Sequence, residues 1–186
     1  MGDPRRERLE RRFALLDRDR DGAVGAADYA LLGERLTAAA GLPADDSVAA
    51  ALQVALAVLW DRIAARAGAG DDGTVTRAQW MASVTNGDGP DPAVERALAD
   101  VVRTTLVAFD PDGLGRWDKV GFDRFAQAHG MSEPDTEGAF DHLDPGGTGT
   151  LSYDVLQRSA REFYGGDEDA PGTWLFGPPP LGVVPS

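Results

Sequence analysis

The sequence predicts an all-α protein in which four helix–loop–helix units form two paired lobes, packed into one compact unit. Glycines recur at the centre of four short polar loops, at Gly22, Gly73, Gly115 and Gly149. A residue suited to a short β-bridge follows each glycine by two positions, and a large apolar residue follows it by seven. An internal repeat of this kind indicates units that bury their apolar faces only by pairing.

The N-terminal pair is expected over residues 1–86. Pro4 suits the first turn of its first helix, and Leu9, Phe13 and Leu16 then recur at i, i+4 and i+7. The two loops are expected to pair through short β-bridges. The helices of this lobe are expected at about 3–16, 26–40, 46–67 and 76–86.

A run of Asn, Gly, Asp and Pro over residues 86–92 is the strongest break in the chain, and we place a linker at 87–92 between the lobes. The C-terminal pair is then expected over 93–164, with its two loops bridged through Trp117 and Leu151. Its helices are expected at about 92–109, 118–129, 133–143 and 152–164.

Residues 165–186 form a tail rich in proline and glycine. It contains the apolar cluster Trp174-Leu175-Phe176, which would be a liability if it were exposed. We therefore expect this tail to dock on the helices and to fill a groove between them.

Composition excludes several classes of function. The net charge is −13, with 23 Asp against 8 Glu, which argues against nucleic acid as a partner. The absence of cysteine excludes disulfides, zinc–thiolate sites and thiol catalysis. The longest apolar run, 48–60, is interrupted by Gln53, and we expect a cytoplasmic protein without a membrane partner.

The first loop, 17–28, has the spacing of an EF-hand calcium loop, with carboxylates at positions 1, 3, 5 and 12 and glycine at position 6. Such a loop binds the ion through these side chains and the backbone carbonyl at position 7. Aspartate at position 12 is one methylene shorter than the usual glutamate, so we expect Mg²⁺ to compete with Ca²⁺. The predicted ligands are Asp17, Asp19, Asp21, the carbonyl of Ala23, and Asp28.

The other three loops are degenerate. Loop two, 68–79, has glycine at positions 1 and 3 and is expected to be structural, with Val75 pairing to Val24. Loop three, 110–121, ends in glycine at position 12, and Asp110, Asp112 and Asp118 make at most a weak second site. Loop four, 144–155, ends in valine and is expected to be free of metal.

The sequence resembles the calerythrin branch of the sarcoplasmic calcium-binding protein family, bacterial proteins with four EF-hands. The match spans roughly residues 8–164. It rests on the Arg8-Leu9-x-x-Arg12-Phe13-x-x-x-Asp17 run, on Asp28, on the metal-poor loop ending Asp72-Gly73-Thr74-Val75-Thr76, and on Gly130-Met131-Ser132. The resemblance implies a compact pair of EF-hand pairs and a role in calcium buffering or transport. The family usually also binds at loops three and four, where this chain has Gly121 and Val155 at position 12.

Three functions are open at this point. The first is a non-catalytic Ca²⁺ buffer or low-capacity sensor that uses mainly loop one. The second is an interaction or scaffold protein with vestigial loops, whose apolar groove binds a partner helix or its own tail. The third is a small-molecule or enzymatic role like that of coelenterazine-using photoproteins, which no residue pattern supports. His129 and His142 lack a nucleophile pattern and are expected at helix ends, so we predict no enzyme.

Overall fold

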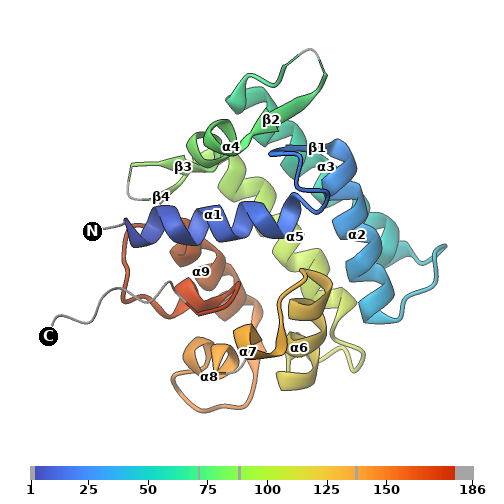
Figure 1. Cartoon of the computed structure of the whole chain (residues 1–186). Helices are drawn as coiled ribbons and strands as arrows, with labels where there is room; N and C mark the ends of the chain where they lie inside the picture. Colours follow the sequence, from blue (N-terminus) through green and yellow to red (C-terminus); the bar gives the residue numbers. More distant parts are fainter. Residues whose placement is uncertain (1–2, 71, 88, 137, 179–186) are drawn as a thin grey trace, which may run out of the picture.

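A computed structural model describes residues 3–70, 72–87, 89–136 and 138–178, and helices dominate this part of the chain (Figure 1). Strands occur there only as three short antiparallel pairs. The predicted all-α class with short β-bridges is therefore confirmed.

Four helices and two short strands form the first half, and they begin and end close to the predicted positions. Asp3 and Asp46 cap two of the helices, because their carboxylates accept hydrogen bonds from free N–H groups of the first turn. The elements are α1 (Pro4–Leu16), β1 (Ala23–Gly25), α2 (Ala26–Ala40), α3 (Ser47–Ala67), β2 (Thr74–Thr76) and α4 (Arg77–Val84).

A small hairpin lies at the linker predicted at 87–92 between the two halves. Strand β3 (Thr85–Asn86) pairs with β4 (Gly89–Pro90), so α4 ends two residues before the predicted end at Asn86. Asp91 follows directly and caps the next helix by accepting hydrogen bonds from the N–H groups of Ala93 and Val94.

The second half differs from prediction in one place. A single helix was expected over 133–143, and this prediction is wrong, because α7 ends at Thr136 and α8 begins at Ala139. Gly138 has a φ of 76°, a left-handed conformation that interrupts a right-handed helix. The elements are α5 (Pro92–Ala108), β5 (Arg116–Trp117), α6 (Lys119–Ala128), α7 (Glu133–Thr136), α8 (Ala139–Leu143), β6 (Leu151–Ser152), α9 (Tyr153–Tyr164) and the 3₁₀ turn η1 (Pro171–Trp174).

The loops pair as the repeat predicts. Strand β1 lies antiparallel to β2 with Val24 opposite Val75, and β5 lies antiparallel to β6 with Trp117 opposite Leu151. All four of these side chains are buried. Each bridge therefore joins two loops and adds apolar packing beneath them.

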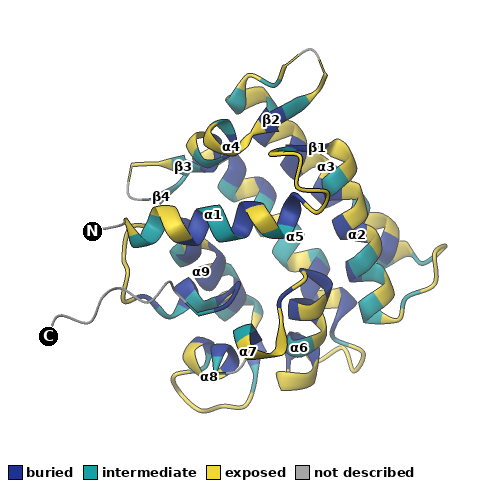
Figure 2. Cartoon of the chain, in the orientation of Figure 1, coloured by how far each residue is buried: buried dark blue, intermediate teal, exposed yellow. Residues whose placement is uncertain are grey.

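One hydrophobic core runs through both halves (Figure 2). Its most extensive helix contact joins α3 of the first half to α5 of the second. Within the first half, the indole N–H of Trp80 donates a 2.9 Å hydrogen bond to the Tyr29 hydroxyl, so both buried rings keep their polar atoms satisfied. The two halves are therefore not independent domains.

Helix α3 is long and apolar enough to cross a membrane, judged by length and composition alone. The helix continues beyond the apolar run at 48–60 to Ala67, through a stretch that contains Asp61, Arg62 and Arg66. Its large side chains, including Leu52, Leu56 and Ile63, are buried in the core, where α3 packs against α2, α4 and α5. Burial in the protein core accounts for the large apolar side chains on this face, whereas Val54 and Val58 of the same helix are exposed.

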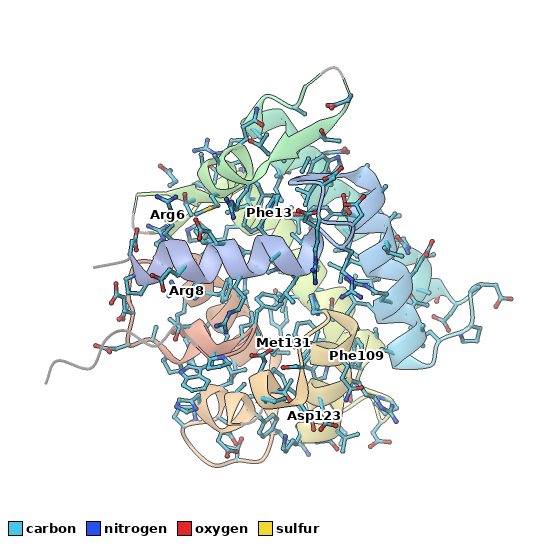
Figure 3. The ribbon with its side chains drawn as sticks, in the orientation of Figure 1. Arg6, Arg8, Phe13, Phe109, Asp123 and Met131 are labelled. Atoms are coloured by element: carbon cyan, nitrogen blue, oxygen red, sulfur yellow. The ribbon has the colours of Figure 1, made fainter. Side chains whose placement is uncertain are left out.

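Helix α1 crosses the front of the molecule between α4 and α9 (Figure 1). Arg8, on the α9 side of this helix (Figure 3), is 2% exposed, and its Nε donates a 2.8 Å hydrogen bond to the carbonyl of Phe163. Its Nη2 donates another 2.8 Å hydrogen bond to the carbonyl of Gly165. The end of α9 leaves these carbonyls without helical partners, so Arg8 supplies the cap.

The segment after α9 folds back onto the helices. Leu175 and Phe176 are buried, and the Phe176 ring lies 4.9 Å from that of Phe163, centroid to centroid. Trp174 stacks on His142 with ring centroids 3.6 Å apart. The residues that follow Pro178 lie outside the described part of the chain.

We predict that Arg8→Met lowers the free energy of unfolding by about 2–4 kcal/mol, because it leaves two buried carbonyls without their charged donor. Urea unfolding followed by circular dichroism measures this difference. Arg6→Met is the matched control, since Arg6 lies on the same helix in an exposed pair with Glu10 and should change stability by less than about 0.5 kcal/mol. Equal effects of the two substitutions would contradict the capping role.

Candidate metal centre

Loop one gathers three carboxylates at the end of α1. Asp17, Asp19 and Asp21 each offer one oxygen, and these three oxygens lie within 4.8 Å of one another. Asp17 is the buried member and is the C-terminal cap of α1, whereas Asp19 and Asp21 are exposed. The structure therefore brings together the residues predicted at positions 1, 3 and 5.

Backbone hydrogen bonds hold this loop in shape. The N–H of Gly22 donates to Oδ2 of Asp17 at 3.1 Å, and the N–H of Ala23 donates to Oδ1 of Asp21 at 2.8 Å. Gly22 has a φ of 86°, and Arg20 has a φ of 61°, which is the one positive value at a non-glycine residue in the described ranges. Backbone strain of this kind, at a residue other than glycine, is often found at binding sites, where the surrounding structure holds the strained residue in place.

The chemistry of the loop fits a hard divalent cation. Oδ1 of Asp17 is buried and has no hydrogen-bond partner. A buried carboxylate oxygen without a partner is costly, and three carboxylates this close repel one another. A cation with a preference for oxygen ligands would remove both costs. Carboxylates of the kind gathered here are the ligands that Ca²⁺ and Mg²⁺ prefer.

Asp28 lies next to this group but outside it. Its Oδ2 accepts a 2.8 Å hydrogen bond from the N–H of Gly25 at the start of α2. Burial raises the pKa of Asp28, the Gly25 hydrogen bond opposes that shift, and repulsion from Asp19, Asp17 and Asp21 adds to it. Its carboxylate therefore interacts with the three aspartates, and its part as the closing ligand, like that of the Ala23 carbonyl, stays a prediction.

Loop three does not assemble a comparable group. Both oxygens of Asp110 accept backbone hydrogen bonds, Oδ1 from Leu114 at 3.0 Å and Oδ2 from Gly115 at 2.6 Å. Asp118 caps α6 through a 2.8 Å hydrogen bond from Gly121. The structure does not bring these residues and Asp112 together as a metal-ligand group, although every residue of this loop is described.

Loops two and four are held together by hydrogen bonds of the same kind. Asp72 accepts from the N–H of Thr74 at 3.1 Å. Asp144 accepts from the Thr148 hydroxyl at 3.0 Å and from the N–H of Gly149 at 2.7 Å. Within the described residues, loop one alone gathers three potential metal ligands.

Two arginines near loop one were missed by reasoning from the sequence. Arg12 on α1 and Arg35 on α2 have Nε and Nη1 atoms that are buried and have no hydrogen-bond partner. The sequence does show that neither arginine can form an ion pair within its own helix, because neither has an acidic residue three or four positions away.

The fold and the loop together define a four-EF-hand protein. A calcium-binding protein of Streptomyces coelicolor has a similar structure, with a TM-score of 0.74, 20% identity, and coverage of 94% of this chain and 99% of that one. A sarcoplasmic calcium-binding protein from amphioxus has a TM-score of 0.65 and 17% identity over 96% of this chain and all of its own. Identities this low establish the fold alone.

The family follows from the sequence. Calerythrin of Saccharopolyspora erythraea is 31% identical over 165 residues, which cover 88% of this chain and 93% of that protein. The chain therefore belongs to the calerythrin family, and the resemblance noted in the sequence is confirmed. No family model matches the sequence.

We predict that Asp28→Asn raises the melting temperature of the metal-free protein at pH 7. The raised pKa of Asp28 means that folding favours its protonated form. Its contribution to stability is therefore fully present below its unfolded pKa and is lost as pH rises through its folded pKa. Asparagine stays neutral and keeps an acceptor for Gly25, so the gain should be present at pH 7 and absent near pH 3.

Thermal unfolding in a chelator, from pH 3 to pH 8, tests this expectation. Asp118→Asn is the matched control, because Asp118 also caps the helix that follows a loop but lies outside the three-aspartate group. A variant at Asp28 that is no more stable than the native protein at pH 7 would contradict the raised pKa of Asp28, which burial causes first and repulsion from the three aspartates increases.

Proposed function

We propose that this protein binds Ca²⁺ through loop one and acts as an intracellular buffer or low-capacity sensor without catalytic activity. One observation carries the proposal: three carboxylate oxygens lie within 4.8 Å of one another, beside an oxygen of Asp17 that is buried without a partner. The calcium-binding proteins that share this fold support it.

The expected capacity is about one ion per chain. In loops three and four the first aspartate already uses both oxygens on groups of its own loop, at Asp110 and Asp144. Loop two has glycine at positions 1 and 3. A cation at any of these loops would have to displace internal hydrogen bonds without gaining a full set of carboxylates.

The alternative role is an interaction protein whose groove binds a partner helix or its own tail. Leu175 and Phe176 favour the tail, because both side chains are buried among the helices. The Phe176 ring is close to the rings of Phe163, Phe125 and His129. With the groove filled in this way, a partner helix would first have to displace Leu175 and Phe176, which favours a buffer over a sensor that exposes apolar surface.

A photoprotein-like role finds little support in the central cavity. This cavity measures about 60 Å³, whereas pockets for organic ligands usually measure about 300–1,000 Å³. His129 lines it, but its Nδ1 is engaged with the carbonyl of Phe125 at 3.0 Å.

We expect isothermal titration calorimetry to find about one Ca²⁺ per chain, and Asp19→Ala to weaken that site at least about tenfold, since one of its few carboxylates is lost. Asp112→Ala is the control, because Asp112 occupies the same position of loop three. No binding at millimolar calcium, or equal losses in the two variants, would contradict the proposal.

We expect Asp28→Glu to increase the preference of the site for Ca²⁺ over Mg²⁺. The longer side chain can supply two oxygens to the larger ion, whereas Mg²⁺ requires a smaller octahedral shell. Competition titrations give the ratio of the two dissociation constants. An unchanged ratio, or an equal change in Asp118→Glu, would show that position 12 does not set the selectivity.

A further inference from the structure

We propose that a small carboxylate anion of the size of acetate binds in the space beside Arg12, held by the Arg12 guanidinium group, with the positive charge of Arg35 nearby. This site is separate from the aspartates of loop one, and the inference does not depend on calcium binding.

Arg12 is the centre of the proposed site. Its side chain is 6% exposed, and its Nε and Nη1 atoms have no hydrogen-bond partner. Its Cζ lies 4.2 Å from the centroid of the Phe176 ring, so the aromatic face covers one face of the guanidinium. That contact leaves the N–H groups at the edge of the guanidinium unsatisfied, and these donors match the oxygens of a carboxylate.

Arg35 adds positive charge close enough to Arg12 for the two guanidinium groups to repel each other, and its Nε and Nη1 atoms are also buried without partners. It lies on α2, which packs against both α1 and α6. Arg18 lies at the same place against Gly130, where an added Cβ would overlap Nη1 of Arg18 and approach Nη1 of Arg35 within 3.9 Å. Gly130 has a φ of 85° and leaves room for these arginines after α6.

No carboxylate of the described chain neutralises this group. None of the ion pairs found among the described residues includes Arg12, Arg18 or Arg35. Burial lowers the pKa of Arg35, and repulsion from Arg18 and Arg12 lowers it further. Burial also lowers the pKa of His129, with further lowering by Arg12 and Arg35 against an opposing hydrogen bond to Phe125. In a chain of net charge −13, cations gathered without an acid point to an anion from solution.

The size of the ligand follows from the space beside Arg12. Arg12 and His129 form a polar part of the wall of the 60 Å³ cavity, and most of the remaining wall is apolar. Arg35 is not one of the residues that line it. A cavity on this scale admits a few water molecules or an acetate ion, whose methyl group suits the apolar wall and whose carboxylate suits the planar guanidinium.

The two histidines provide a test by NMR in the full chain. His129 lies beside the proposed site, with its ring centroid 5.0 Å from that of Phe176, whereas His142 stacks on Trp174. Potassium acetate added at constant ionic strength, with chloride as the replaced anion and a chelator present, should shift the His129 resonances saturably in the millimolar range. The His142 resonances should not follow the same curve.

Variants and other probes decide between outcomes. Arg35→Gln should weaken acetate at least about tenfold, whereas Arg62→Gln, the same change at an exposed position, should leave it unaltered. Acetate should raise the melting temperature of the native protein, because it binds the folded state. Arg12→Met should still fold, and acetate should no longer raise its melting temperature.

Neutral acetamide should have no effect on the His129 resonances. The proposal would be overturned if acetate shifted the His129 resonances no more than chloride does, or if inorganic phosphate shifted them more strongly. It would also be overturned if acetate bound Arg35→Gln as tightly as it binds the native protein.

Discussion

The fold depends on pairing, because one helix–loop–helix unit cannot cover its own apolar face. Bridges between Val24 and Val75 and between Trp117 and Leu151 join the loops in pairs. The contact between α3 and α5 then joins the pairs through one shared core. None of these interactions uses the carboxylate of a predicted metal ligand. The architecture can therefore retain four loops even though three of them lack the carboxylates of an ion site.

The loops show two uses of the same residue. In loops three and four, the aspartate at position 1 uses both oxygens on its own loop, so it stabilises the turn without an ion. In loop one, Asp17 uses only Oδ2 in this way and leaves Oδ1 buried without a partner. All three loops have Asp at position 1. In loops three and four its oxygens are fully hydrogen-bonded, whereas in loop one a cation would supply the missing partner of Oδ1.

The helices and the paired loops could be predicted from the sequence because glycine spacing and apolar periodicity are local signals. The break at Gly138 could not, since glycine inside a helical pattern is often tolerated. The β3–β4 hairpin could not be predicted, because the Asn, Gly, Asp and Pro residues of 86–92 are as typical of a linker as of a hairpin turn. The gathering of Asp17, Asp19 and Asp21 follows from their spacing, whereas the approach of Arg12 to Arg35 depends on how α1 packs against α2.

Charge is separated across the end of α1. Arg12 and Asp17 are five residues apart, which places them about 140° apart around a helix, so they face different surroundings. No ion pair joins them, and each has a buried atom without a partner. A cation at Asp17 and an anion at Arg12 would each relieve repulsion near the last turns of the same helix. Because α1 also caps α9 through Arg8, stabilising its end would favour the contact between the two halves of the molecule.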